Sequence, residues 1–313
     1  MNRSRFIGKK IGVLMGGLSA EREVSLKTGA AVTAALERRG CQVIPIIVDA
    51  EIPKVLGREK IDVAFIALHG RFGEDGAIQG LLEIMRIPYT GSGIAASSLA
   101  MNKISSRDIF HAHRLPTPPS QAFFKSEAEA PHPDRLPFGL PAVVKPVSEG
   151  SSVGVRLVAT PEEFENAVQG AFYFGPSILV EKYIAGKEVH VGILNEKALG
   201  AIEIRPKGAF YDYSAKYIPG QSRHIFPAPL PAEVYETVCD LGMRAHRALG
   251  CRNYSRVDLL LDKENHPCLL EVNSLPGMTE TSLMPEIAQG VGMSFDDLVE
   301  AILETASSSN ERI

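Results

Sequence analysis

The first third of the chain alternates short apolar runs with longer helical patterns. The apolar runs, at residues 11–15, 43–48 and 63–68, are continuous, as is typical of parallel strands that are covered on both faces. A helical pattern over residues 23–39 ends at Gly40, and a second helix near 78–85 precedes a short segment at 88–90. The sequence therefore predicts a doubly wound α/β unit, in which ligands bind beyond the carboxyl ends of the strands.

Two glycine-rich turns lie at these predicted strand ends. Gly16-Gly17 precedes Glu21, and His69-Gly70 follows the third run. A dinucleotide site is the obvious alternative, because Asp49 ends the second run, where an acid that binds ribose belongs. However, the first turn, GVLMGGLSAE, lacks the G-x-G-x-x-G fingerprint, and the GSG at 91–93 is incomplete. These departures disfavour an NAD site.

A proline-rich linker follows this first unit. Helical residues 94–113 end at LPTPP (115–119), and a chain of 313 residues is long enough for two or three domains. Residues 142–194 are predicted to form strand, glycine loop, strand, helix, strand and strand, with a capping box of Thr160 and Glu163 at the helix start. The polar segment 207–221 is too long for a simple connection and is typical of a lid or binding loop.

Residues 256–282 carry oxygen-bearing side chains on an otherwise apolar hairpin. Glu271 and Asn273 share one face of the second strand, because side chains alternate along a strand, and Asp258 on the first strand could share that face. Burying two carboxylates is costly unless a cation neutralises them. An all-oxygen set suits Mg²⁺ that is shared with the phosphates of a substrate. The solvent-facing side of an edge hairpin explains the pattern equally well, so both interpretations stay open at this point.

A loop containing glycine and serine follows another apolar strand. Lys145 closes that strand, and EGSSVG (149–154) comes directly after it. Such a loop offers backbone N–H groups and hydroxyls to phosphate oxygens, although a flexible turn is the plain alternative. A Walker loop is excluded, because no G-K-[ST] occurs. Glu181 and Glu188 lie at strand ends, where they would contact a nucleotide or be ordinary surface acids.

Composition argues against several classes of protein. The 33 basic and 37 acidic residues give a net charge of −4, which disfavours a nucleic-acid partner. No apolar run approaches the length of a membrane span, and the basic, apolar N-terminus fits a first strand and its turn better than a signal peptide. The four cysteines show no metal-binding or disulfide spacing. We therefore expect a cytoplasmic protein without a membrane partner.

Together, these motifs resemble one enzyme superfamily. ATP-grasp enzymes hold ATP between two small α+β subdomains and ligate a carboxylate to an amine or thiol. They carry the same order of residues: Lys103, Lys145, the EGSS loop, Glu181, Glu188, Asp258, Glu271 and Asn273. Six longer blocks are similar to D-alanine–D-alanine ligases: GGLSAEREVSLKTG (16–29), ALHGRFGEDGAIQGLLE (67–83), PYTGSG (88–93), VKPVSEGSSVGV (144–155), FYDYSAKY (210–217) and LEVNSLPGMTETSL (270–283).

The resemblance spans nearly the whole chain and implies its fold and domains. We expect an α/β N-terminal domain with a doubly wound parallel sheet, followed by an α+β ATP-grasp fold of two subdomains. The N-terminal substrate domain would span residues 1–102. The central subdomain with the phosphate loop would span 103–186, and the C-terminal subdomain with the hairpin and the long loop would span 187–313.

The resemblance also implies a nucleotide site. Two Mg²⁺ (or Mn²⁺) ions would join ATP to Asp258, Glu271 and Asn273. The lysines would neutralise the phosphates, Glu181 would face the adenine and Glu188 the ribose. The implied ATP-binding residues are Lys103, Lys145, Glu149, Gly150, Ser151, Ser152, Glu181, Lys182, Glu188 and Lys216.

The substrates implied by the resemblance are two D-alanines, which the family joins through a D-alanyl phosphate for peptidoglycan precursor synthesis. Glu21 would hold the first ammonium in a trio with Ser151 and Tyr217. The implied oxyanion donors are Arg256 and the backbone N–H of Gly277. His69 would line the first-substrate side, and a clamp of Ser282 and Leu283 would bind the second carboxylate.

Three alternatives remain beside dipeptide synthesis. The chain could be another ATP-grasp carboxylate–amine ligase, or a ligase that joins D-alanine to D-lactate. Tyr217 disfavours the D-lactate type, which often carries histidine in this loop. The third alternative, a nucleotide-binding regulator with a decayed site, is disfavoured because every residue that the chemistry needs is present. The sequence leaves the oligomeric state open, with a homodimer among the alternatives.

Overall fold

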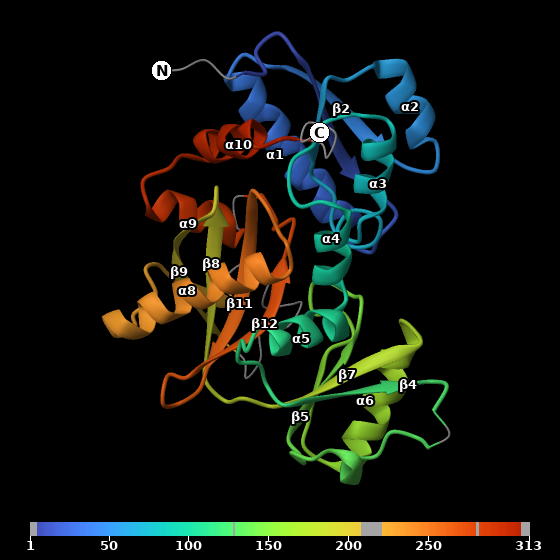
Figure 1. Cartoon of the computed structure of the whole chain (residues 1–313), viewed down its shortest axis with the longest axis vertical. Coiled ribbons are helices and arrows are strands. Elements are labelled where there is room, and N and C mark those ends of the chain that lie inside the picture. Colours follow the sequence, from blue (N-terminus) through green and yellow to red (C-terminus); the bar gives the residue numbers. More distant parts are fainter. Residues whose placement is uncertain (1–4, 128, 208–220, 280–281, 308–313) are drawn as a thin grey trace.

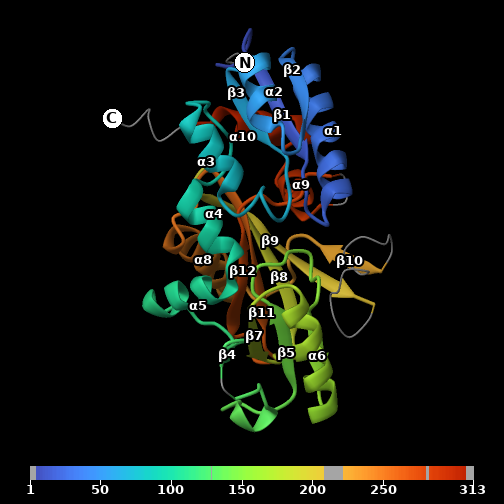
Figure 2. The same ribbon diagram turned by 90° about the vertical axis from the view of Figure 1, so that its right-hand side faces the viewer.

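We analysed a computed structural model of the chain, which describes residues 5–127, 129–207, 221–279 and 282–307. Figure 1 shows three parts along the longest axis, with the N-terminal domain at one end and the β4–β7 sheet at the other. The larger antiparallel sheet lies between them, and the turned view in Figure 2 shows the same order. Both ends of this middle sheet therefore face a neighbouring part of the molecule.

The N-terminal domain is a parallel sheet with helices packed against it. The sheet has the order β2-β1-β3, and every β3 residue is buried, as the continuous apolar run predicted. Its elements are β1 (Lys10–Gly16), α1 (Arg22–Arg38), β2 (Gln42–Val48), α2 (Ile52–Glu59), β3 (Val63–Ile66) and α3 (Ala77–Ile84). Tyr89 extends the sheet by a parallel bridge to Ala64. The predicted doubly wound α/β unit is thus confirmed.

The central subdomain is a four-stranded antiparallel sheet in the order β4-β7-β5-β6. Its elements are β4 (Ser120–Phe124), η1 (Pro133–Arg135), β5 (Ala142–Pro146), β6 (Arg156–Val158), α6 (Pro161–Tyr173) and β7 (Ser177–Lys182). The predicted capping box of α6 is present, because Thr160 Oγ1 accepts from Glu163 N at 3.2 Å and the Glu163 carboxylate accepts from Thr160 N at 3.2 Å. Strand β4, which pairs with β7, was not predicted from the sequence.

The C-terminal subdomain is a five-stranded antiparallel sheet in the order β10-β9-β8-β11-β12. Its elements are β8 (Lys187–Leu194), β9 (Lys197–Pro206), β10 (Ser222–Ile225), α8 (Ala232–Ala248), β11 (Tyr254–Leu261), β12 (Pro267–Asn273), α9 (Leu283–Gly290) and α10 (Phe295–Glu304). Helix α10 returns to the N-terminal domain and packs beside α1, where Arg38 Nε donates to Asp296 at 2.9 Å. A helix near the C-terminal end of the sequence therefore packs against the first helix of the N-terminal domain.

Residues 94–113 were predicted as one continuous helix, and this prediction is wrong. The structure has two helices, α4 (Ile94–Met101) and α5 (Lys103–Ala112), which are separated at Asn102. Asn102 has an extended backbone, and its side chain accepts from Ser105 N at 3.0 Å. A short amide at this position caps a new helix better than it continues an old one. The break places Lys103 at the start of α5.

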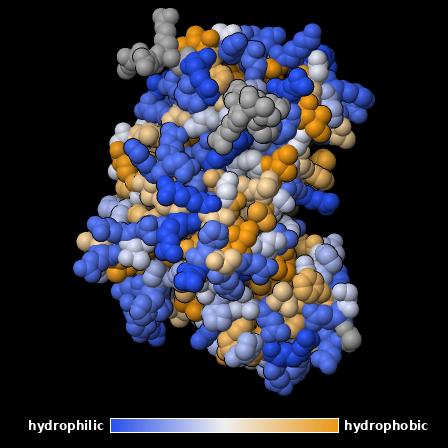
Figure 3. All heavy atoms as spheres, in the orientation of Figure 1, coloured by the Kyte–Doolittle hydropathy of each residue, from blue (hydrophilic) through white to orange (hydrophobic). Residues whose placement is uncertain are grey.

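None of the helices among the described residues is long and apolar enough to span a bilayer. On the face shown in Figure 3, hydrophobic side chains are scattered among hydrophilic ones.

Candidate active site

Three adjoining cavities lie where the parts of the molecule meet, and Gly150 and Glu271 line all three. The first cavity is also lined by the predicted residues Lys103, Lys145, Glu149, Ser152, Glu181, Lys182, Glu188 and Asp258. The second is lined by Glu21, His69, Ser151, Arg256, Asn273, Gly277, Ser282 and Leu283. The structure therefore brings together every predicted site residue that it describes. Lys216 and Tyr217 lie outside the described residues.

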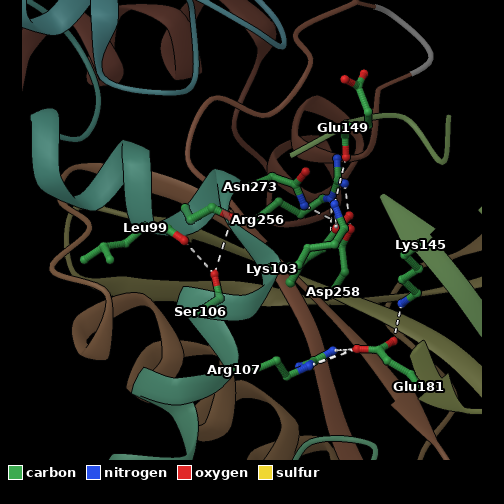
Figure 4. Close-up of polar contacts among 12 residues, drawn as sticks. Leu99, Lys103, Ser106, Arg107, Lys145, Glu149, Glu181, Arg256, Asp258 and Asn273 are labelled. Atoms are coloured by element: carbon green, nitrogen blue, oxygen red, sulfur yellow. Dashed lines mark hydrogen bonds and ion pairs between the residues drawn. The ribbon is translucent and has the colours of Figure 1, made fainter. Parts of the chain in front are cut away.

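The β11–β12 hairpin directs its polar side chains to one face. Asp258 is paired with Glu271 across the two strands, and Arg256 with Asn273. Arg256 donates Nε and Nη2 to the two oxygens of Asp258, at 2.7 and 2.8 Å, and Asn273 Nδ2 donates to Oδ2 at 3.0 Å (Figure 4). The expectation that Asp258 shares the face of Glu271 is confirmed. Asp258 is only 3% exposed, so this is not the outer side of a solvated hairpin.

The charge of Asp258 is fixed by its neighbours. Burial raises the pKa of this carboxyl group, but the Arg256 guanidinium and His190 lower it more strongly, so the pKa lies well below its usual range. Asp258 is therefore an anion at neutral pH, as a ligand for a hard cation must be.

His190 is a site residue that the sequence interpretation missed. It lies in β8 opposite Asp258, and its side chain is fully buried. Its Nδ1 is 2.6 Å from Asp258 Oδ1, and its Nε2 is 2.9 Å from Glu188 Oε1. Burial lowers the pKa of the imidazole, but Asp258 and Glu188 outweigh burial and raise it. The available signal was its two-residue spacing from Glu188, which puts both side chains on one face of a strand.

The glycine and serine loop connects the first domain to the hairpin. Ser151 Oγ donates to Glu21 Oε1 across 130 positions of sequence. Gly150 lies directly against the same carboxylate, because a Cβ there would be 2.8 Å from Glu21 Oε2, and a larger residue would require this side chain to move. Lys103 Nζ donates to the backbone oxygen of Glu149 at 2.8 Å and lies 3.6 Å from Glu271 Oε2. The loop thus lies between the predicted amino-binding acid and the predicted metal-binding acid.

A buried ion cluster forms the floor of the first cavity. Glu181 is paired with Lys145 through one carboxylate oxygen and with Arg107 through the other (Figure 4). Arg107 Nη1 also donates to the backbone oxygen of Leu269 at 2.7 Å. Sequence interpretation missed Arg107, because a basic residue in an amphipathic helix is more often on the surface. Arg107 links α5, the central sheet and β12 at one point.

Because Glu181 is paired with Arg107 and Lys145, we expect the folded state to lose stability in acid. Burial raises the pKa of Glu181, but Arg107 and Lys145 lower it to about 2 from 4.5. A carboxyl whose folded pKa is depressed stabilises the fold above its unfolded pKa, and this stabilisation is lost as the pH falls through the folded pKa. We expect the stability advantage of the chain over Glu181→Gln to shrink by about 3 kcal/mol between about pH 5 and pH 2. Urea unfolding of both proteins measures it, and a constant difference across this range would contradict the assignment.

Polar groups from the N-terminal domain and from the segment after β12 line the second cavity. His69 is buried, and its Nε2 lies 3.0 Å from Thr28 Oγ1. Ser282 Oγ accepts from Thr279 N at 3.0 Å. A Cβ on Gly277 would lie 2.9 Å from Ser282 Oγ, so a larger residue there would require the serine hydroxyl to move. Leu283 begins α9, where backbone N–H groups without helical partners favour an anion.

The hairpin residues fit a divalent metal. Asp258 and Glu271 provide carboxylate oxygens on one face, and Glu271 is 29% exposed toward the cavities that it lines. Asn273 turns its Nδ2 to Asp258, which directs its amide oxygen away from that carboxylate. Carboxylate and amide oxygens beside two lysines are the donor set that Mg²⁺ uses when it is shared with substrate phosphates.

Comparison with known proteins gives consistent results over the whole chain. The family model described as D-ala D-ala ligase C-terminus matches residues 109–304, and the corresponding N-terminus model matches residues 51–92. A D-alanine–D-alanine ligase of Geotalea uraniireducens is 60% identical over 96% of this chain and 96% of its own length. Its counterpart in Geobacter sulfurreducens is 54% identical over 98% and 96% of the two chains.

A solved structure has the same architecture. The D-alanine–D-alanine ligase of Bacillus anthracis, solved in complex with ATP, superimposes with a TM-score of 0.84 at 34% identity, covering 95% of this chain and 97% of that one. The fold, the geometry of the cavities and the similarity over the full length lead to one assignment. This chain belongs to the D-alanine–D-alanine ligase family.

Proposed function

We propose that the chain joins two D-alanines into D-alanyl-D-alanine at the expense of ATP, for peptidoglycan precursor synthesis. The observation that carries this proposal is the position of Glu271. It lines the cavity with the two lysines and also the cavity with Glu21, Gly277 and Ser282. The proposed phosphate-binding and amino-acid-binding groups would therefore meet at the proposed metal-binding carboxylate.

The first step would take place between the two cavities. The carboxylate oxygen of one D-alanine attacks the γ-phosphorus of ATP, the bond to the β-phosphate breaks, and ADP leaves. Such a transfer depends on positioning and charge neutralisation more than on covalent help. Lys103 and Lys145 approach the first cavity from α5 and β5 and would neutralise the phosphates. When bound at Asp258, Glu271 and Asn273, Mg²⁺ would supply further neutralisation of the transferred charge.

The second step would take place beside Arg256. The neutral amine of the second D-alanine attacks the acyl carbon of the D-alanyl phosphate, and the proton that it gives up is carried away by the departing phosphate. The bond from carbon to the phosphate oxygen then breaks, and phosphate leaves. The tetrahedral carbon carries an oxyanion, which preorganised donors stabilise. Arg256 and Gly277 line the same cavity and are the proposed donors.

The two substrates would be held at opposite ends of the second cavity. Glu21 would bind the ammonium of the first D-alanine, and His69, which lines the same cavity, would lie on the same side. Ser282 and the N-terminus of α9 would bind the carboxylate of the second. Glu181 and Lys182 would lie at the adenine end of the first cavity, and Glu188 would bind the ribose. For Lys216 and Tyr217, the proposed roles rest on the resemblance alone.

Two further properties are part of the proposal. The family resemblance supports a cytoplasmic enzyme. A homodimer is the oligomeric state that we would test first, because closed two-fold dimers are the commonest oligomers.

Release of ADP tests the proposed substrates. With MgATP, we expect ADP release that requires D-alanine and that L-alanine does not replace. D-lactate offered as the second substrate beside D-alanine should give little ester at any pH between about 6 and 9. Equal ADP release with L-alanine would contradict the proposed substrate. Efficient ester formation would instead identify a ligase of the D-lactate type.

A further inference from the structure

Both nitrogens of His190 approach acids of the first cavity. The imidazole lies 2.6 Å from Asp258 Oδ1 on one side and 2.9 Å from Glu188 Oε1 on the other. Asp258 belongs to β11 and Glu188 to β8, and both line the cavity with the two lysines. A single buried ring therefore connects the predicted metal ligand to the predicted ribose ligand.

The position of His190 in β8 separates it from the apolar core. Its neighbours Val189 and Val191 are buried in the cluster that packs beneath α8. Side chains alternate along a strand, so His190 is on the opposite face, with Glu188 and Gly192. A residue that only fills space on this face would not need two polar nitrogens, since burying them is costly unless each has a partner. Nε2 is within hydrogen-bond distance of Glu188 Oε1, and Nδ1 makes a close ion-pair contact with Asp258 Oδ1, so the polar neighbours of both nitrogens are site carboxylates.

The other contacts of Asp258 show what His190 adds. Arg256 binds both oxygens of Asp258, and Asn273 donates to Oδ2. These residues come from the hairpin itself, so they hold Asp258 relative to β11 and β12 only. The His190 contact comes from β8 and reaches Glu188 as well. His190 therefore contacts two carboxylates that line the same cavity.

We propose that His190 is a positioning residue that holds Asp258 and Glu188 at a fixed separation, so that metal and nucleotide bind as one unit. The proposal rests on the proposed function for the roles of these two acids. Outer partners of metal-binding carboxylates commonly change metal affinity by about 10- to 100-fold when they are removed. His190 would not touch the substrates, so it should act on metal and nucleotide and leave D-alanine unaffected.

Substitution with leucine and glutamine tests the proposal on the full-length chain. Binding of Mn²⁺ to the purified protein with ADP, followed by electron paramagnetic resonance of the free ion, needs no turnover. We expect His190→Leu to weaken Mn²⁺ binding at least about tenfold, and His190→Gln to weaken it less, because one amide can still donate to Asp258. In the assay of ADP release, KM for MgATP should rise while KM for D-alanine stays within about twofold.

A second buried histidine provides the matched control. His246 in α8 is also fully buried, and its Nδ1 lies 2.7 Å from Ser255 Oγ, outside the lining of the three cavities. His246→Leu should lower thermal stability but leave Mn²⁺ binding within about twofold. If His190→Leu behaves like this control, the proposal is overturned.

Two remaining outcomes are also decisive. If His190→Leu does not fold, His190→Gln decides, and unchanged Mn²⁺ binding in that variant would overturn the proposal. If the parent chain binds Mn²⁺ and ADP but does not ligate D-alanine, the proposed function is wrong. The Mn²⁺ binding of the variants still decides whether His190 is a positioning residue.

Discussion

Replacing Glu271 with glutamine should abolish turnover and leave the fold intact. Glu271 lies opposite Asp258, lines all three cavities, and is 3.6 Å from Lys103 Nζ. Glutamine keeps the shape of the side chain but removes the negative charge that would help to hold a divalent cation. We expect kcat for ADP release with D-alanine and MgATP to fall at least about 1,000-fold. Because the side chain is partly exposed, the midpoint of thermal unfolding should change by only a few degrees.

An exposed acid of the same hairpin provides the control for this substitution. Glu264 lies in the turn between β11 and β12 and is exposed. Glu264→Gln removes the same charge from the same hairpin and should leave kcat within about twofold. If Glu271→Gln kept a tenth or more of the activity, the hairpin would not be part of the mechanism.

Replacing Arg256 with lysine should separate the two steps of the reaction. The guanidinium reaches Asp258 with two nitrogens, and lysine keeps the charge but loses this planar fork. The second step should suffer most, because it forms the oxyanion that Arg256 is proposed to bind. We expect dipeptide formation to fall about 100-fold or more. Exchange of labelled oxygen between the bridging and non-bridging positions of ATP, which reports the first step, should fall by less than about tenfold.

A neighbouring arginine tests whether this effect is specific. Arg252 Nε donates to the backbone oxygen of Gly91 at 3.1 Å, and Arg252 lines none of the three cavities. Arg252→Lys should leave both measured rates within about threefold. Equal losses of isotope exchange and dipeptide formation in Arg256→Lys would contradict the role in the second step. Such equal losses would mean that Arg256 acts in phosphate transfer or that it only holds Asp258 in position.

Local sequence patterns predicted the elements whose residues interact within one segment. The buried run of β3 and the capping box at Thr160 each depend on residues a few positions apart. The shared face of Asp258 and Glu271 also follows from the alternation of side chains in a hairpin. The family resemblance added the order in which these segments combine.

Other features depend on contacts between distant segments. Arg107 gains its role from Glu181, which lies 74 residues away, and from a backbone oxygen 162 residues away. His190 looks like the interior of an apolar strand until β11 places Asp258 beside it. At Asn102, local propensity allowed a continuous helix, but the structure uses the amide as a cap. The spacing of His190 from Glu188 is a local signal for a shared face, but the contacts of Arg107 and His190 with distant segments become visible only in the fold.

Identification of the product tests the central claim most directly. The purified chain is incubated with MgATP and D-alanine, and the products are separated by chromatography. The account predicts one D-alanyl-D-alanine and one phosphate for each ADP, and no dipeptide from L-alanine. Formation of ADP without dipeptide, or of equal dipeptide from L-alanine, would contradict it.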